Sequence, residues 1–191
     1  MNEIKILFFA LGSFFGMDDA RITADKTTVV IYPKEQEIEI IQEDLFVLIQ
    51  SKRDERLVLE QWDKIYKWKE KHTAWVKELD NFVVKDFKLS PVKMTTQTYL
   101  VLIRPHLTFK YTKEKDLESM GIWFNADKNK FYLNNIPEDN IQSDYGKLEG
   151  NYWVFNADDR ISFTIEPYLK KTDKFKNSRT SLKKILRKYK E

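Results

Sequence analysis

The side chains in this sequence that could serve as nucleophiles or metal ligands are few and scattered. The two histidines, His72 and His106, are joined by no HxH or HxxxH spacing, so a histidine zinc site is not expected. Cysteine is absent, which excludes thiolate nucleophiles, disulfides and Cys-ligated metals. No G-x-S-x-G sequence supplies a serine nucleophile, and no glycine-rich phosphate loop occurs. The sequence predicts neither a metal nor a cofactor.

Neighbouring carboxylates are the remaining candidates for acid–base chemistry, of the kind that glycosidases use. Glu60 and Asp63 are one helical turn apart and could face the same way. The same segment carries Lys64, Lys67 and Lys71, so a salt-bridged helix surface explains both acids without catalysis. A carboxylate-dependent hydrolase acting on glycans is therefore an alternative, and an enzyme is not the main expectation. The other pairs are Glu43 with Asp44 and Asp158 with Asp159.

Aromatic residues make up 14% of the chain and are the strongest indication of a binding site. Exposed aromatic rings can stack on sugars or line an apolar pocket. Trp68 lies off the apolar stripe of its expected helix, which favours exposure. Trp123 and Trp153 are further candidates, although cross-strand packing would explain both equally well. These three residues predict a non-enzymatic binding protein whose ligand is a glycan or an apolar small molecule.

The C-terminal end of the chain is strongly basic. Residues 170–191 carry ten Lys or Arg against two acids, a net charge of +8, so the total of +3 leaves −5 for the rest. Leu182, Ile185, Leu186 and Tyr189 follow a helical spacing, which predicts a basic amphipathic helix. Its apolar stripe could contact an anionic membrane surface, but docking on the acidic body is the favoured interpretation. Sequence-specific nucleic-acid binding is not expected. The contacting cations would be Lys183, Lys184, Arg187, Lys188 and Lys190.

The N-terminal end is apolar. Residues 6–17 form an uncharged run of twelve, which as a helix would rise about 18 Å and fall short of a bilayer core of about 30 Å. This length, after Lys5, is typical of a secretory signal peptide, although the small residues that a cleavage site needs are poorly placed. We expect a periplasmic or secreted protein, with a cytoplasmic location as the alternative. In that alternative the run is a buried first element built on Leu7, Phe9, Leu11 and Phe15.

Hydrophobic periodicity predicts strands around one principal helix. Residues 51–80 have apolar positions at spacings of three and four, so they predict one long helix, capped by Ser51 or Asp54 and anchored by Trp62 and Ile65, with a break near residues 72–73 as the alternative. Two similar segments, 121–134 and 152–164, each contain Asn-Ala-Asp between aromatic runs, and both predict β-hairpins. Further strands are expected in a hairpin over 20–32 that turns at 25–26, and over 35–41, 45–49, 82–89, 99–104 and 106–111.

The fold class expected from these elements is α+β, with a mainly antiparallel sheet, one long helix and a short basic C-terminal helix. A helix packed on a curved sheet and a barrel with the helix outside fit the spacing equally well. The expected organisation is a leader over 1–17, one domain over 18–171 and a basic tail over 172–191. The expected function is that of an exported or envelope-associated binding protein. Besides the hydrolase, the alternative is a cytosolic protein whose basic tail binds an anionic surface.

Overall fold

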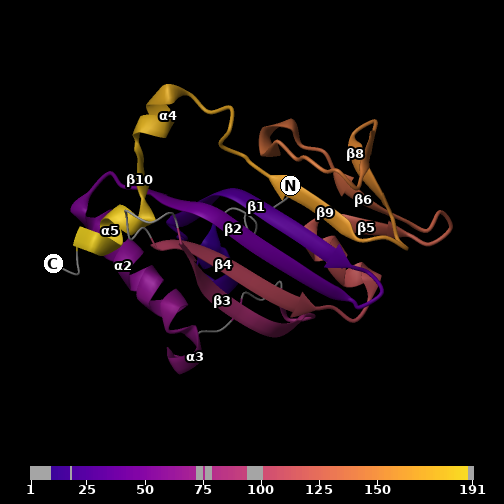
Figure 1. Ribbon diagram of the computed structural model, residues 1–191, viewed down its shortest axis with the longest axis horizontal. Coiled ribbons are helices and arrows are strands. Elements are labelled where there is room, and N and C mark those ends of the chain that lie inside the picture. Colours follow the sequence, from indigo (N-terminus) through magenta and orange to yellow (C-terminus); the bar gives the residue numbers. More distant parts are fainter. Residues whose placement is uncertain (1–9, 18, 72–74, 76–78, 94–100, 189–191) are drawn as a thin grey trace.

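The computed structural model describes residues 10–17, 19–71, 75, 79–93 and 101–188, and it confirms an α+β fold with two antiparallel sheets (Figure 1). The larger sheet has the order β3-β4-β2-β1-β9, with β10 also paired to β2, and the smaller has the order β5-β6-β8-β7. Neither sheet closes on itself, so the curved open sheet is correct and the barrel is not. The strands are β1 (Ile22–Tyr32), β2 (Glu37–Leu48), β3 (Val83–Lys93), β4 (Val101–Lys110), β5 (Ile122–Asn125), β6 (Lys130–Asn134), β7 (Lys147–Glu149), β8 (Tyr152–Asn156), β9 (Ile161–Ile165) and β10 (Arg179–Ser181).

The first hairpin is longer than the sequence predicts. The expected turn at Asp25 and Lys26 is wrong, because β1 continues to Tyr32 and the chain turns after it, at Pro33. Proline lacks the N–H that a strand needs and so ends β1. The two strands expected over 35–41 and 45–49 are one strand, β2, in which Asp44 takes a φ of 53° opposite Asp25. Aspartate tolerates this left-handed conformation, so the irregularity is absorbed without ending the strand.

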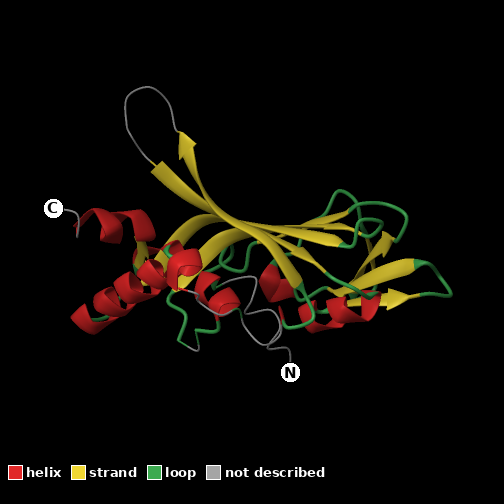
Figure 2. Cartoon of the chain, turned by 90° about the horizontal axis from the view of Figure 1, so that it is seen from below, coloured by secondary structure: helices red, strands yellow, loops and turns green. Residues whose placement is uncertain are grey.

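Helices gather on one side of the larger sheet (Figure 2). Helix α2 (Lys52–Tyr66) begins with a capping box, in which Ser51 accepts from the backbone of Asp54 and Asp54 accepts from the backbone of Ser51. Its buried residues include Val58 and Ile65, which follow the predicted stripe. The helix ends earlier than expected, and a short helix α3 (Trp68–Lys71) follows it. The expected continuation to residue 80 falls partly outside the described residues.

The described part of the apolar N-terminal run belongs to the core. Helix η2 (Leu11–Phe15) lies beside β1, and Leu11 and Phe14 are fully buried. The ring of Phe14 stacks on Phe109 at 6.2 Å, and that of Phe15 lies 4.9 Å from Trp75. This packing follows the buried-element alternative and gives the signal-peptide interpretation no support. Removal of the run in the cell is not tested, and Leu7 and Phe9 lie outside the described residues.

The two segments that share Asn-Ala-Asp fold differently. The first forms the expected hairpin of β5 and β6. The second is not a hairpin, because β8 pairs with β6 and β7 in the smaller sheet whereas β9 pairs with β1 in the larger one. The two turns lie side by side, since the Asn129 side chain donates to Asp158 at 2.9 Å and the Ala157 N–H donates to the Asn129 carbonyl. The second turn thus connects the two sheets, and the first turn packs against it.

The C-terminal tail is three short elements, α4 (Asp173–Asn177), β10 and α5 (Leu182–Lys188). Strand β10 pairs with residues 46–48 of β2, on the edge that β4 occupies further along at residues 37–41. Leu182 and Ile185 are buried, so the apolar stripe of α5 docks on the body as in the second sequence interpretation. No helix within the described residues is both long and apolar enough to cross a membrane.

Candidate functional site

An exposed aromatic surface lies on the smaller sheet. Successive residues of a strand point to opposite sides, so buried Phe131 and Leu133 place Tyr132 on the solvent side of β6. The register puts Trp123 directly opposite Tyr132, and Tyr132 directly opposite Val154. Tyr152 lies two residues before Val154 and so faces the same side. We call Trp123, Tyr132 and Tyr152 the aromatic face.

The rings of the aromatic face remain open to solvent. Trp123 is 37% exposed and Tyr152 is 45% exposed, although both are large aromatic residues. The rings of Tyr132 and Tyr152 meet edge to face, with centroids 6.2 Å apart and an interplanar angle of 84°. Val154 lies on the same side of the sheet, next to Tyr132, and is an apolar residue that is only 5% exposed. The same alternation places polar groups around them, which are Asn125, Lys130, Asn134, Lys147, Glu149 and Asn156.

The other two tryptophans that the sequence singles out lie elsewhere. Trp153 is on the core-facing side of β8, where its indole nitrogen is buried without a hydrogen-bond partner. Trp68 packs in a cluster with Trp75 at 5.2 Å and Phe87 at 5.9 Å. Trp123 is thus the one member of the predicted set on the aromatic face. Tyr132 was missed, although the alternation of residues 130–134 could have identified it as an outward-facing aromatic.

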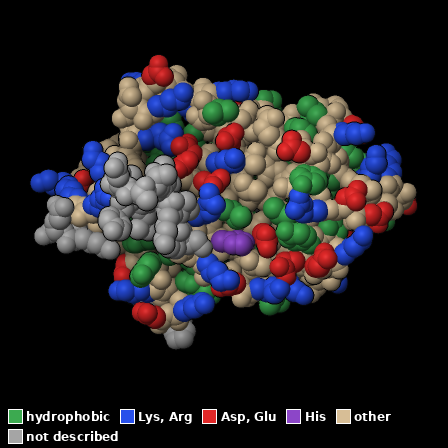
Figure 3. Space-filling model, viewed as in Figure 1, with side chains coloured by type: hydrophobic (Ala, Val, Ile, Leu, Met, Phe, Trp, Pro, Cys, Tyr) green, Lys and Arg blue, Asp and Glu red, His purple; other side chains and the backbone are tan. Residues whose placement is uncertain are grey.

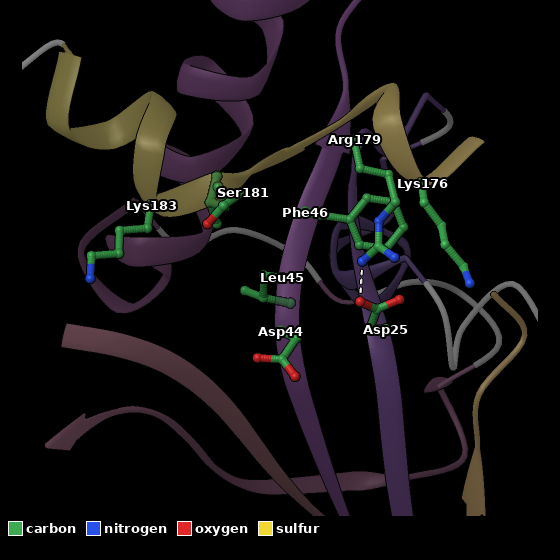
Figure 4. A pocket seen from close by; sticks show the side chains of 9 residues that line it. Asp25, Asp44, Leu45, Phe46, Lys176, Arg179, Ser181 and Lys183 are labelled. Atoms are coloured by element: carbon green, nitrogen blue, oxygen red, sulfur yellow. Dashed lines mark hydrogen bonds and ion pairs between the residues drawn. The ribbon is translucent and has the colours of Figure 1, made fainter. Parts of the chain in front are cut away.

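A pocket of roughly 300 Å³ lies where the C-terminal segment meets β2 (Figure 4). The guanidinium of Arg179 covers the ring of Phe46 at 3.7 Å and forms an ion pair with Asp25. Figure 4 shows Lys176 beside this pair and Lys183 on the other side of the pocket, with its ammonium turned away from Arg179. The remaining lining residues are Asp44, Leu45, Ser181 and Leu182.

The contacts of Arg179 and Phe46 hold the tail in place. Phe46 also meets Tyr168 edge to face at 5.2 Å, and burial raises the pKa of this tyrosine. The Lys183 ammonium is buried without a hydrogen-bond partner, and burial, aided by the charge of Arg187, lowers its pKa. Because the Arg179 guanidinium is already paired, the pocket serves first as the attachment point of the C-terminal segment.

The basic residues predicted to contact an anionic surface differ in exposure and in their partners. Lys184 and Arg187 are exposed, whereas Lys183 is partly buried. The Lys188 ammonium lies 2.9 Å from the Glu55 carboxylate, and so it ties α5 to α2. Lys190 lies outside the described residues. The anionic-surface role of these residues stays a prediction.

Most of the paired carboxylates have structural partners. Glu43 is ion-paired with Arg104, and Asp63 with Lys67 at 2.9 Å. Asp158 and Asp159 accept hydrogen bonds from asparagine side chains in the two adjacent turns. His106 has a buried Nε2 that lies 4.0 Å from the Glu39 carboxylate. Within the described residues, no group of three or more His, Asp or Glu could hold a metal ion. The hydrolase alternative is not tested by this geometry.

Comparisons with models of known protein families, with curated protein sequences and with solved structures found no match for the chain. The arguments about function below therefore rest on the geometry of the described residues.

Proposed function

We propose that the protein is a non-catalytic saccharide-binding protein whose contact surface is the aromatic face. The observation that carries the proposal is the alignment of Trp123, Tyr132 and Tyr152 on one solvent-facing side of a sheet. A pyranose ring presents apolar C–H groups on its faces and hydroxyl groups around its edge. Aromatic rings have negatively charged faces and large apolar areas, so they suit the C–H side of a sugar.

The polar groups around the rings suit the sugar hydroxyls. Asn134 and Lys147 lie on the same side of the sheet as the rings, and amide and ammonium groups hydrogen-bond well to hydroxyl oxygens. The surface is open, whereas a site for a wholly apolar small molecule would be a concave and largely enclosed cavity. A saccharide is therefore favoured over an apolar ligand. The compartment stays a prediction, and a polysaccharide ligand favours a periplasmic or secreted protein.

The proposal is tested by affinity electrophoresis in gels that contain soluble polysaccharides, with a glycan array to select them. We expect retardation by at least one polysaccharide, and we expect Trp123→Ala and Tyr152→Ala each to weaken it by about tenfold, since one aromatic contact contributes on the order of 1 kcal/mol. Tyr66→Ala is the matched control, because this tyrosine is 63% exposed on α2 and far from the smaller sheet in sequence. Binding that survives both aromatic-face variants, or its absence across the array, refutes the proposal.

A further inference from the structure

A second exposed surface lies on the C-terminal segment before β10. Figure 1 shows α4 set apart from both sheets, and Figure 3 shows Lys and Arg side chains in this part of the molecule as over the rest of the face. Four lysines of this segment are exposed, whereas Asp173 is the single acid between residues 170 and 177. The four are Lys170, Lys171, Lys174 and Lys176.

Two other cations of the tail are paired with acids of the body, whereas these four lysines have no such partner among the described residues. Arg179 is paired with Asp25 and Lys188 with Glu55, so acids of the body hold the ends of the tail. Within the described residues, none of the four lysines forms an ion pair or a side-chain hydrogen bond. Their charges therefore remain available to a partner outside the chain.

An apolar side chain stands beside these charges. Leu169 is 56% exposed and immediately precedes Lys170. Aromatic contacts fix the segment to β2, since Tyr168 and Phe175 stack on each other at 5.3 Å and both contact Phe46. The side chain of Thr172 also accepts from the Phe175 N–H and so caps α4. The structure thus presents one apolar residue and four cations on a fixed support.

We propose that residues 169–176 form a contact site for the anionic headgroups of a lipid bilayer. Lysines near an anionic bilayer are attracted to its surface, and an apolar residue among them can enter the headgroup boundary. Single-stranded nucleic acid is disfavoured as the partner, because it binds through bases stacked on free aromatic rings. Phe175 within this segment and Tyr168 just before it are occupied by each other and by Phe46.

The inference does not depend on saccharide binding, and it moves the anionic-surface site from α5 to the segment that precedes β10. Residues of α5 use their apolar stripe to dock on the body, so the membrane-facing combination of charge and exposed apolar area is found at residues 169–176. Binding through four cations and one leucine should be reversible and should weaken as salt screens the charges.

The test is co-sedimentation of the full chain with vesicles of phosphatidylcholine alone and of phosphatidylcholine mixed with an equal amount of phosphatidylglycerol. We expect binding to the mixed vesicles that decreases with salt, and little binding to phosphatidylcholine. Replacing the four lysines by Gln should reduce the partition coefficient by on the order of a thousandfold. Leu169→Ser should reduce it by about tenfold.

The matched control removes the same charge elsewhere, through Gln at four exposed lysines: Lys34, Lys110, Lys115 and Lys128. This variant should retain most of the binding, and circular dichroism should show that both quadruple variants melt like the parent protein. The proposal is overturned if the two variants lose binding equally, if Lys184→Gln with Arg187→Gln alone abolishes it, or if the parent protein does not sediment with the mixed vesicles. Equal binding to a single-stranded oligonucleotide, lost in the same variant, would also overturn the choice of lipid.

Discussion

The two sheets of this protein are assembled in different ways. The larger sheet combines strands that span Ile22 to Ser181, and it is packed by η2 from one end of the chain and by α5 from the other. The smaller sheet takes its four strands from a short continuous stretch, Ile122 to Asn156. One sheet therefore depends on contacts between residues far apart in the sequence, and the other on contacts between neighbours.

The difference bears on where a ligand surface can exist. Each terminal element covers apolar area of the larger sheet, so this sheet carries much of the common core. The smaller sheet packs only one side against the core, through residues such as Phe131 and Phe155, and leaves the aromatic face open. A side that contributes little to packing can keep exposed rings for binding. Substitutions in the two sheets should accordingly have unequal effects on folding.

The largest effect is expected from deletion of residues 1–17. The deletion removes Leu11, Phe14 and Phe15 from beneath the larger sheet, and each such truncation in a core costs about 2–5 kcal/mol. Their sum approaches the whole stability of a typical domain, which is about 5–15 kcal/mol. We expect the shortened protein to show no cooperative thermal transition in near-ultraviolet circular dichroism.

Phe14→Leu is the control for this deletion, because it keeps most of the apolar volume and should melt cooperatively at a somewhat lower temperature. A shortened protein that melts close to the full chain would show that the N-terminal run is dispensable. It would restore the interpretation of this run as a leader.

Each end of the chain allowed two interpretations, and for the described part of the N-terminal run the structure follows the less favoured one. An apolar run and a basic amphipathic stripe have the composition of a signal peptide and of a membrane-surface helix. The same apolar residues also suit a buried helix, and composition alone does not distinguish a bilayer from a protein core. Leu11 and Leu182 are buried because strands distant in the sequence offer them apolar area to pack against. Periodicity within a short segment does not reveal that area.

Local patterns were more reliable. The capping residues Ser51 and Asp54 and the hairpin of β5 and β6 were predicted, because both depend on neighbouring residues. The second Asn-Ala-Asp segment carries the same local signal, yet β9 joins β1 in the other sheet, since pairing partners are chosen by the tertiary structure. For the candidate site, Trp123 was predicted, whereas Tyr152 became evident only from the register of β8 against β6.

A smaller effect is expected from truncation of the docked C-terminal stripe. Leu182, the first residue of α5, is buried, so Leu182→Ala should destabilise the protein by about 2–5 kcal/mol in urea unfolding. Lys184→Ala, on the exposed side of the same helix, should change stability by less than about 0.5 kcal/mol. Similar values for the two variants would mean that α5 does not pack on the larger sheet.

In the smaller sheet, a single added methyl group should have a moderate effect. A Cβ at Gly146 would lie 2.6 Å from the ring of Phe155, which is buried among the core residues. Gly146→Ala should therefore cost about 1–3 kcal/mol by displacing this ring, as overpacking does elsewhere. Gly150→Ala is the comparison: its Cβ meets no neighbour, but its φ of 59° is strained for alanine and should cost about 1–2 kcal/mol. An unchanged melting curve for Gly146→Ala would show that Phe155 is free to move.

The smallest effects should come from two aspartates that cap helices beside the two sheets. The N–H of Gln50 donates to Asp54, which lowers the pKa of this carboxyl, and Ser51 lowers it further. Burial raises the pKa of Asp116, but hydrogen bonds from Lys113 and Thr112 outweigh it and leave the pKa lowered.

A carboxyl whose pKa is lower in the folded protein stabilises the fold at pH values above the pKa of the unfolded chain, about 3.9. It loses this contribution as the pH falls through the pKa of the folded protein. At pH 7, Asp54→Asn should therefore be less stable than the parent protein in urea, and the two should converge at acid pH. Asp116→Asn should show the same convergence with a smaller difference, because its carboxylate is more exposed and caps a short helix beside β5. If the difference between Asp54→Asn and the parent stayed constant with pH, the charge of Asp54 would have no part in holding α2 under the larger sheet.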